Sequence, residues 1–305
     1  MIFYIVQFGP AVAGLIVGLV VWAIRRKAWA TLPTRRRLWT AGGVGIALAL
    51  WVAYSWWSVF PFWLPSFGED GFVVFGFLPH VVPLVLCLVA LAFAGVPSRV
   101  AGAKGAAQLS ARNLFTFAPR PWMFLLAGVS AAIVVLTVVA GLASGPDEDG
   151  RYLMYTVQMS TNSSAGTSIY GWFYSVPCLV LVALVVAVSL LSLWAIGRPP
   201  LAADRERDSA RRGEQARVVL GVASGGLLLH LGSILNSLYG TSMLRGGLDA
   251  GLAGWVELGT GFAAIGPALL VAGYIAIVAG LAAWWMVLLA VVIAGRRPAG
   301  RVPVR

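Results

Sequence analysis

The sequence predicts an all-α, multi-pass integral membrane protein, in which the whole chain forms one bundle of seven transmembrane helices. Three observations predict this class. Of the 305 residues, 60% are hydrophobic and only 11% are charged, and the mean hydropathy is +0.88. Several uninterrupted apolar runs reach the roughly 20 residues that cross about 30 Å of hydrocarbon. The basic residues gather in short clusters beside these runs, as membrane topology signals do.

Each apolar run between charged or Gly/Pro-rich breakers is predicted to be one span. The expected helices are at about 2–24, 38–60, 73–95, 122–143, 173–196, 218–238 and 264–294. The first has no basic residues before its apolar stretch, which predicts an uncleaved anchor rather than a secretory signal. Two spans between 251 and 294 would export the arginines of the tail. We therefore expect one long, tilted helix there, preceded by an interfacial segment over 251–262.

The distribution of charge predicts the orientation. Twenty of the 22 basic residues fall in the segments 25–37, 96–121, 197–217 and 296–305, and the other two are Arg151 and Arg245. The positive-inside rule therefore places the N-terminus outside and the C-terminus in the cytoplasm. The net charge of +11 is then a topology signal. We expect the lipid bilayer as a partner, and we expect no binding of nucleic acid.

Composition also predicts a location. Only two basic residues are lysines, and the chain is rich in Ala, Val, Gly and Arg, which indicates a GC-rich bacterial genome and hence the bacterial cytoplasmic membrane. Cys87 and Cys178 both lie inside apolar runs, so we expect packing residues rather than a disulfide or a metal pair. No cofactor is expected. The spacing of Gly14 and Gly18 is one that allows close helix contact.

Two loops carry the densest charge. The longest external loop, 144–172, contains Asp147, Glu148 and Asp149, which could hold a hard cation or contribute to a field that attracts cationic ligands. An ordinary solvated turn explains the same residues. The cytoplasmic loop 197–217 mixes both signs. It is predicted to form a solvated helical extension of the sixth span or a docking surface for a soluble partner.

The predicted membrane interior contains no Asp, Glu, Lys or Arg, which argues against an antiporter that binds ions at a buried carboxylate. Uncharged polar residues are most frequent in the sixth span. There His230, Ser233 and Ser237 share one helix face, and Asn236 lies close to it. Such a face makes either interhelical hydrogen bonds or a ligand site.

His80 stands between Pro79 and Pro83, which are expected to mark the start of the third span. This position predicts a solvated histidine at the wet, outer end of that helix. A modest tilt brings His80 and His230 to similar depth, so a bis-histidine haem is geometrically conceivable.

The sequence holds no Ser-His-Asp set, no paired catalytic carboxylates at membrane depth and no phosphate-binding loop. We therefore expect a non-enzymatic, permease-like or accessory subunit that works with a membrane or cytoplasmic protein partner. One alternative is a sensor or resistance protein that binds a cationic or lipidic ligand on its acidic, aromatic outer face. A second is a small haem- or copper-binding membrane protein that uses His80 and His230.

Overall fold

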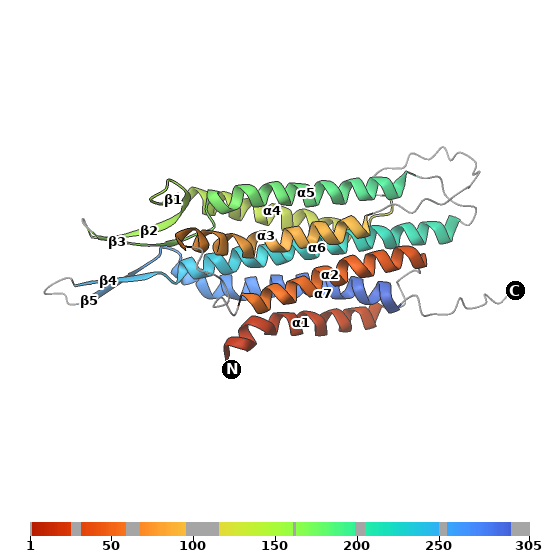
Figure 1. Cartoon of the computed structure of the whole chain (residues 1–305), viewed down its shortest axis with the longest axis horizontal. Coiled ribbons are helices and arrows are strands. Elements are labelled where there is room, and N and C mark those ends of the chain that lie inside the picture. Colours follow the sequence, from red (N-terminus) through yellow and green to blue (C-terminus); the bar gives the residue numbers. More distant parts are fainter. Residues whose placement is uncertain are drawn as a thin grey trace.

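The structure is a computed structural model that describes residues 2–25, 32–58, 68–95, 116–160, 163–198, 205–249 and 255–293. In these ranges seven α-helices run alternately up and down, and two small sheets project from one end of the bundle (Figure 1). Six of the described helices are long and apolar enough to cross a membrane. The all-α class and the multi-pass membrane character are therefore confirmed.

The helices are α1 (Ile2–Arg25), α2 (Thr34–Trp57), α3 (Gly68–Ala94), α4 (Arg120–Leu142), α5 (Trp172–Gly197), α6 (Arg205–Ser242) and α7 (Gly266–Ile293). The strands are β1 (Gly145–Pro146), β2 (Tyr152–Ser160), β3 (Ser163–Ser168), β4 (Arg245–Asp249) and β5 (Trp255–Gly259). We call the end with the strands the hairpin end and the opposite one the arginine end. Positions 59–60, 161–162, 199–204, 251–254 and 294 of the predicted spans and loops lie outside the described residues.

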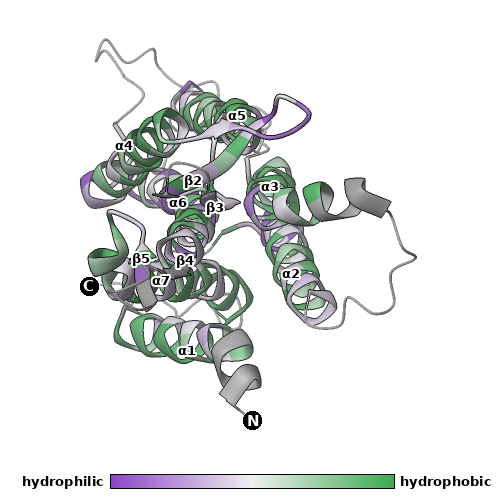
Figure 2. Cartoon of the chain, turned by 90° about the vertical axis from the view of Figure 1, so that its left-hand side faces the viewer, coloured by the Kyte–Doolittle hydropathy of each residue, from purple (hydrophilic) through white to green (hydrophobic). Residues whose placement is uncertain are grey.

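Helix α6 is the centre of the bundle. It packs against α3, α4, α5 and α7, as the view from the hairpin end shows (Figure 2). Its 38 residues span about 57 Å at 1.5 Å per residue. The apolar part of α6 is buried on nearly all sides, because four neighbours cover it.

Glycines let α6 and α7 approach closely. Gly225 faces Gly280, and Gly232 faces Gly273, so that each helix carries glycines seven residues apart along the contact. A Cβ added at Gly280 would lie 2.7 Å from the Gly225 carbonyl oxygen, and one added at Gly232 would lie 3.0 Å from that of Gly273. The two backbones therefore meet directly, as at small-residue contacts between membrane helices.

Helix α1 lies at the edge of the bundle and packs mainly on α7. Gly14 and Gly18 form this contact, as their spacing predicts. A Cβ at Gly14 would lie 2.7 Å from the Cβ of Leu281, and one at Gly18 would lie 2.9 Å from that of Trp285.

The two hairpins pack on each other. The sheets have the order β1-β2-β3 and β4-β5, and all pairs are antiparallel. Along β2, more buried residues (Leu153, Tyr155, Val157 and Met159) alternate with more exposed ones. A Cβ at Gly246 of β4 would lie 2.5 Å from the Met159 sulfur. We call the packed unit of β2 to β5 the hairpin cap.

Residues 255–259, which belong to the predicted interfacial segment, form strand β5, because pairing with β4 satisfies their backbone groups and brings Arg245 within 3.8 Å of Glu257. One prediction about local structure is wrong. Helix α3 begins at Gly68, so Pro79 and Pro83 lie inside it rather than at its start. Proline remains tolerable there because neighbouring helices can satisfy the freed backbone groups.

Candidate functional site

The described interior contains one cluster of titratable side chains near the hairpin end. His80 comes from α3, His230 from α6, and Tyr170 from the link between β3 and α5; all three are buried. The ring centroids of His80 and Tyr170 are 4.5 Å apart, and those of His80 and His230 are 6.3 Å apart. The structure thus brings the two histidines to the same depth. We call these three residues the histidine–tyrosine cluster.

Hydrogen bonds fix the state of His230. Its Nδ1 lies 2.8 Å from the main-chain oxygen of His80, which can only accept, so Nδ1 carries the proton and donates. The Tyr170 hydroxyl lies 3.4 Å from Nε2, and in the neutral ring it would donate to this nitrogen. The cluster is therefore a hydrogen-bonded link between α3, α6 and the segment that leads into α5.

The prediction that His80 is a solvated residue is wrong, since its side chain is only 4% exposed. Two features bury it. Helix α3 extends beyond His80 towards the hairpin end, and Tyr170 and Tyr174 pack against the imidazole, the latter with ring centroids 6.1 Å apart. In the described part of the chain, His80 Nδ1 has no hydrogen-bond partner. The sequence carries no signal for this burial, because Tyr170 is far from His80 along the chain.

The other polar residues of α6 do not join the cluster. Ser233 donates to the Leu229 carbonyl of its own helix over 3.2 Å. Asn236 faces α7, where a Cβ at Gly273 would lie 2.4 Å from its Oδ1. Ser237 is half-buried. Among the described residues, none of these three hydrogen-bonds to His80 or His230, and a ligand site on their shared helix face stays a prediction.

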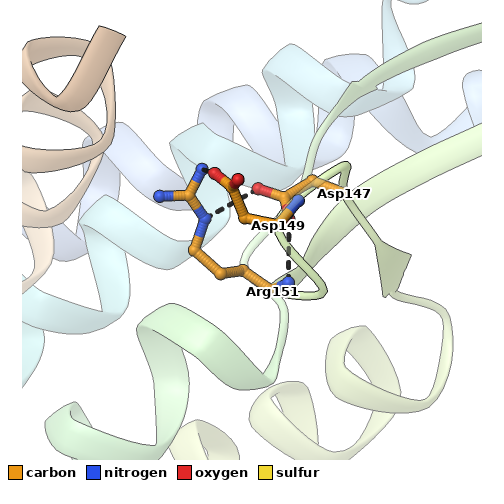
Figure 3. Close-up of polar contacts among 3 residues, drawn as sticks. All are labelled: Asp147, Asp149 and Arg151. Carbon is orange, nitrogen blue, oxygen red and sulfur yellow. Dashed lines mark hydrogen bonds and ion pairs between the residues drawn. The ribbon is translucent and has the colours of Figure 1, made fainter.

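The acidic turn of the 144–172 loop is closed by an arginine (Figure 3). Arg151 Nε donates to Asp147 Oδ2 over 2.8 Å, and its Nη2 pairs with Asp149. Asp147 Oδ1 also accepts the backbone N–H groups of Asp149 and Arg151 at 3.0 and 2.8 Å. Glu148 is exposed. The guanidinium lies 5.8 Å from the centroid of the Phe173 ring, which joins this turn to α5.

These contacts change the acidity of Asp147. Desolvation acts to raise its pKa, but hydrogen bonds from the backbone and side chain of Arg151, the arginine charge and the N–H of Asp149 lower it. The net shift of the pKa is downward, so the ionised form is favoured. Two of the three carboxylates proposed to attract a cation are thus paired within the protein.

At the arginine end, basic residues of α2 close the C-terminal ends of other helices. Arg36 Nη2 donates to the Ala94 carbonyl at the end of α3 over 3.1 Å. Arg37 Nε and Nη2 donate to the carbonyls of Val291 and Val292 near the end of α7, over 2.8 and 3.1 Å. These carbonyls have no partner within their own helix, and a positive charge suits the negative end of the helix dipole.

The N-terminal extension of α6 behaves in the same way. Arg212 Nη1 donates to the Ile196 carbonyl near the end of α5 over 3.1 Å, and its Nη2 pairs with Asp208 at 2.9 Å. Asp208, Arg212 and Glu214 are buried, and Glu214 pairs with Arg217 at 3.1 Å. The extension is helical, as predicted, but much of it packs against the bundle instead of being solvated.

Within the described ranges, no three His, Cys, Asp or Glu side chains lie close enough together to hold a metal ion. No protein-family model, curated protein or solved structure matches the chain. The site must therefore be interpreted from its own geometry.

Proposed function

We propose that the protein is a non-enzymatic accessory subunit of a membrane complex, and that it presents the hairpin cap to a protein partner. The observation that carries this proposal is the packing of the two hairpins into one unit that projects from the bundle (Figure 1). Isolated two-stranded hairpins are marginally stable in water, so a projecting surface of defined shape requires such packing.

Contacts to the helical part support a preorganised cap. The ring of Tyr155 in β2 packs edge-on against Phe262, which precedes α7, with centroids 5.5 Å apart. Thr241 near the end of α6 donates to the Ser168 carbonyl at the end of β3 over 2.9 Å. Preorganisation lowers the entropy cost of binding, so a surface fixed in this way suits recognition.

The outward face of the cap indicates the chemistry of the partner. Thr156 and Gln158 of β2 and Ser164 of β3 are exposed, whereas Val157 between them is half-buried. In the described sheet β3 is an edge strand, and short polar edges can be extended by a strand of another protein. A partner with a polar, extended segment fits this surface.

The proposed location is the cytoplasmic membrane of a bacterium, with seven spans, the hairpin cap outside and the arginine end in the cytoplasm. The positive-inside rule supports this orientation, because the described basic residues other than Arg151 and Arg245 lie at or near the arginine end. The alternative of a cationic ligand has less support, since Arg151 already pairs with both Asp147 and Asp149 and offsets one of their two negative charges.

Site-specific photocrosslinking in the native membrane tests the proposal. A photoreactive residue at Thr156 should give one protein adduct in near-stoichiometric yield, and the same residue at the inward-facing Val157 is the matched control. Adducts of equal yield at both positions, or lipid adducts alone at Thr156, would contradict the proposal. Turnover of a substrate by the purified chain alone would contradict the non-enzymatic part.

A further inference from the structure

One positive charge at the arginine end is buried at the C-terminal end of α3 but, among the described residues, forms no ion pair with a carboxylate. This charge belongs to Arg36, whose side chain is 8% exposed. The Ala94 carbonyl binds Nη2, but Nη1 has no hydrogen-bond partner among the residues that the structure describes. Burying an ion is costly unless it is paired and hydrogen-bonded, so this geometry calls for an anion on the Nη1 side.

A second unpartnered donor lies one helical turn away. Thr40 is fully buried, and within the described ranges its hydroxyl has no hydrogen-bond partner. Positions four residues apart lie on the same helix face, so Thr40 and Arg36 form one polar strip along α2. The same face approaches α3, because a Cβ at Gly43 would lie 2.5 Å from that of Phe93.

The start of α2 adds to the attraction for an anion. The helix begins at Thr34 after Pro33, without a side-chain cap and without an acidic residue in its first turn. The first N–H groups of a helix lack partners within it and carry partial positive charge, which makes a helix start a favourable place for phosphate. Arg36 lies in this first turn.

The position along the membrane normal suits a lipid headgroup. Leu38 and Trp39 follow directly and are 69% and 53% exposed, so the faces of α2 beside the buried strip of Arg36 and Thr40 point away from the bundle. The Trp39 ring stacks on Phe93 with centroids 5.7 Å apart. Tryptophan is enriched at the depth of the headgroups, which is where a phospholipid carries its phosphate.

We propose that Arg36, Thr40 and the first turn of α2 bind a phosphate group. The phosphate of an anionic phospholipid is the source at hand in the membrane, and free inorganic phosphate has the same chemistry. Arg37 does not share this role, since its Nε and Nη2 are occupied by α7. The site is independent of partner binding at the hairpin cap, which lies at the other end of the bundle.

Native mass spectrometry of the full-length, delipidated protein tests the site, with phosphatidylglycerol and phosphatidylcholine as competing probes. The wild type should retain one phosphatidylglycerol in preference to phosphatidylcholine. Arg36→Gln removes the charge but leaves an amide that can still donate to Ala94, and should weaken retention by about tenfold or more. The matched control Arg35→Gln alters the same charge at an exposed position and should change retention by less than about twofold.

Thr40→Val provides an independent test should Arg36→Gln fold poorly. It keeps the shape and removes only the hydroxyl, with an expected loss of about two- to tenfold. Inorganic phosphate added without lipid distinguishes the two sources of the phosphate group. Binding of inorganic phosphate that depends on Arg36 identifies free phosphate as the ligand. Retention of phosphatidylglycerol without binding of inorganic phosphate identifies the lipid as the ligand. Equal losses for Arg35→Gln and Arg36→Gln, or no preference for phosphatidylglycerol together with no phosphate binding, would overturn the proposal.

Discussion

Gly225 and Gly226 are neighbours in the sequence of α6, yet they contact different helices. A Cβ at Gly225 would lie 3.0 Å from the Gly280 carbonyl oxygen of α7, and one at Gly226 would lie 2.3 Å from the Cβ of Cys87 in α3. Cys87 is fully buried, so neither side can yield without moving a helix. At the scale of residues, the centre of the bundle thus depends on the absence of a side chain at both positions, at Gly225 towards α7 and at Gly226 towards α3.

We expect Gly226→Ala to destabilise the protein by about 1–3 kcal/mol, because it overpacks the contact between α3 and α6. The control is Gly45→Ala in α2, where an added Cβ meets nothing within 4 Å. This control should be neutral or stabilising by up to about 1 kcal/mol, since alanine is the better helix former. Thermal unfolding of both variants in one detergent measures the difference, and equal effects would contradict the packing argument.

The acidic turn should make stability depend on pH. The pKa of Asp147 is lower in the folded protein than in the unfolded chain, where it is about 3.9. Its contribution is therefore fully present above the unfolded value and is lost as the pH falls through the folded value. The melting temperature of Asp147→Asn should lie below that of the wild type at pH 7, and the gap should narrow below about pH 4. Glu148→Gln, at an exposed position, should show no such gap at any pH.

At the scale of elements, helix ends are closed by side chains of other helices. The carbonyls at the ends of α3, α5 and α7 accept from Arg36, Arg212 and Arg37. The basic clusters that indicate topology in the sequence therefore also have a structural use in the folded protein. This explains why α2 and α6 start before their apolar stretches do.

The Asp208–Arg212 pair can be tested by a double-mutant cycle. Arg212→Met removes the hydrogen bond to Ile196 and the ion pair with the buried carboxylate of Asp208, so we expect a loss of about 2 kcal/mol or more. Adding Asp208→Asn should restore part of this loss, because the remaining side chain is neutral. The measurement is the free energy of unfolding in detergent. A double variant no more stable than Arg212→Met would show that the charge of Asp208 does not matter.

Hydropathy predicts which stretches cross a membrane, but not how far each helix continues beyond it. The all-α, multi-pass class follows from composition and run length, and the structure confirms it. The start of α3 at Gly68 could not be predicted in this way, because residues 68–71 are glycine or acidic, whereas the helical extension at the start of α6 was predicted from the mixed charges of 197–217. Strands β4 and β5 were missed because each is short and gains its stability from the other.

The candidate site, too, could be predicted from the sequence only in part. The sequence indicates that His80 and His230 can reach similar depth, and the structure places their rings 6.3 Å apart. The third member, Tyr170, could not be predicted, because it enters from a loop whose path depends on the whole bundle. The burial of His80 depends on that same loop. Because the path of the loop could not be predicted, a histidine beside two prolines was expected to be solvated.

At the scale of the whole molecule, orientation in the membrane can be measured with single cysteines. Both native cysteines are buried, so background labelling by a membrane-impermeant maleimide should be low. Ser164→Cys in the hairpin cap should react in intact cells, whereas Glu206→Cys at the arginine end should react only after permeabilisation. Both positions are exposed. The reverse pattern would invert the proposed topology.

The contact between α1 and α7 joins the first helix of the chain to the last. During synthesis at roughly 5–20 residues per second, α1 leaves the ribosome about 15–50 s before α7 is complete. Throughout that interval Gly14 and Gly18 have no helix to pack on, and Arg37 lacks the carbonyls of Val291 and Val292. A nascent chain therefore holds α1 without its contacts to α7 until α7 has been made. A chain that stopped short of α7 would keep Gly14 and Gly18 without the residues on which they pack.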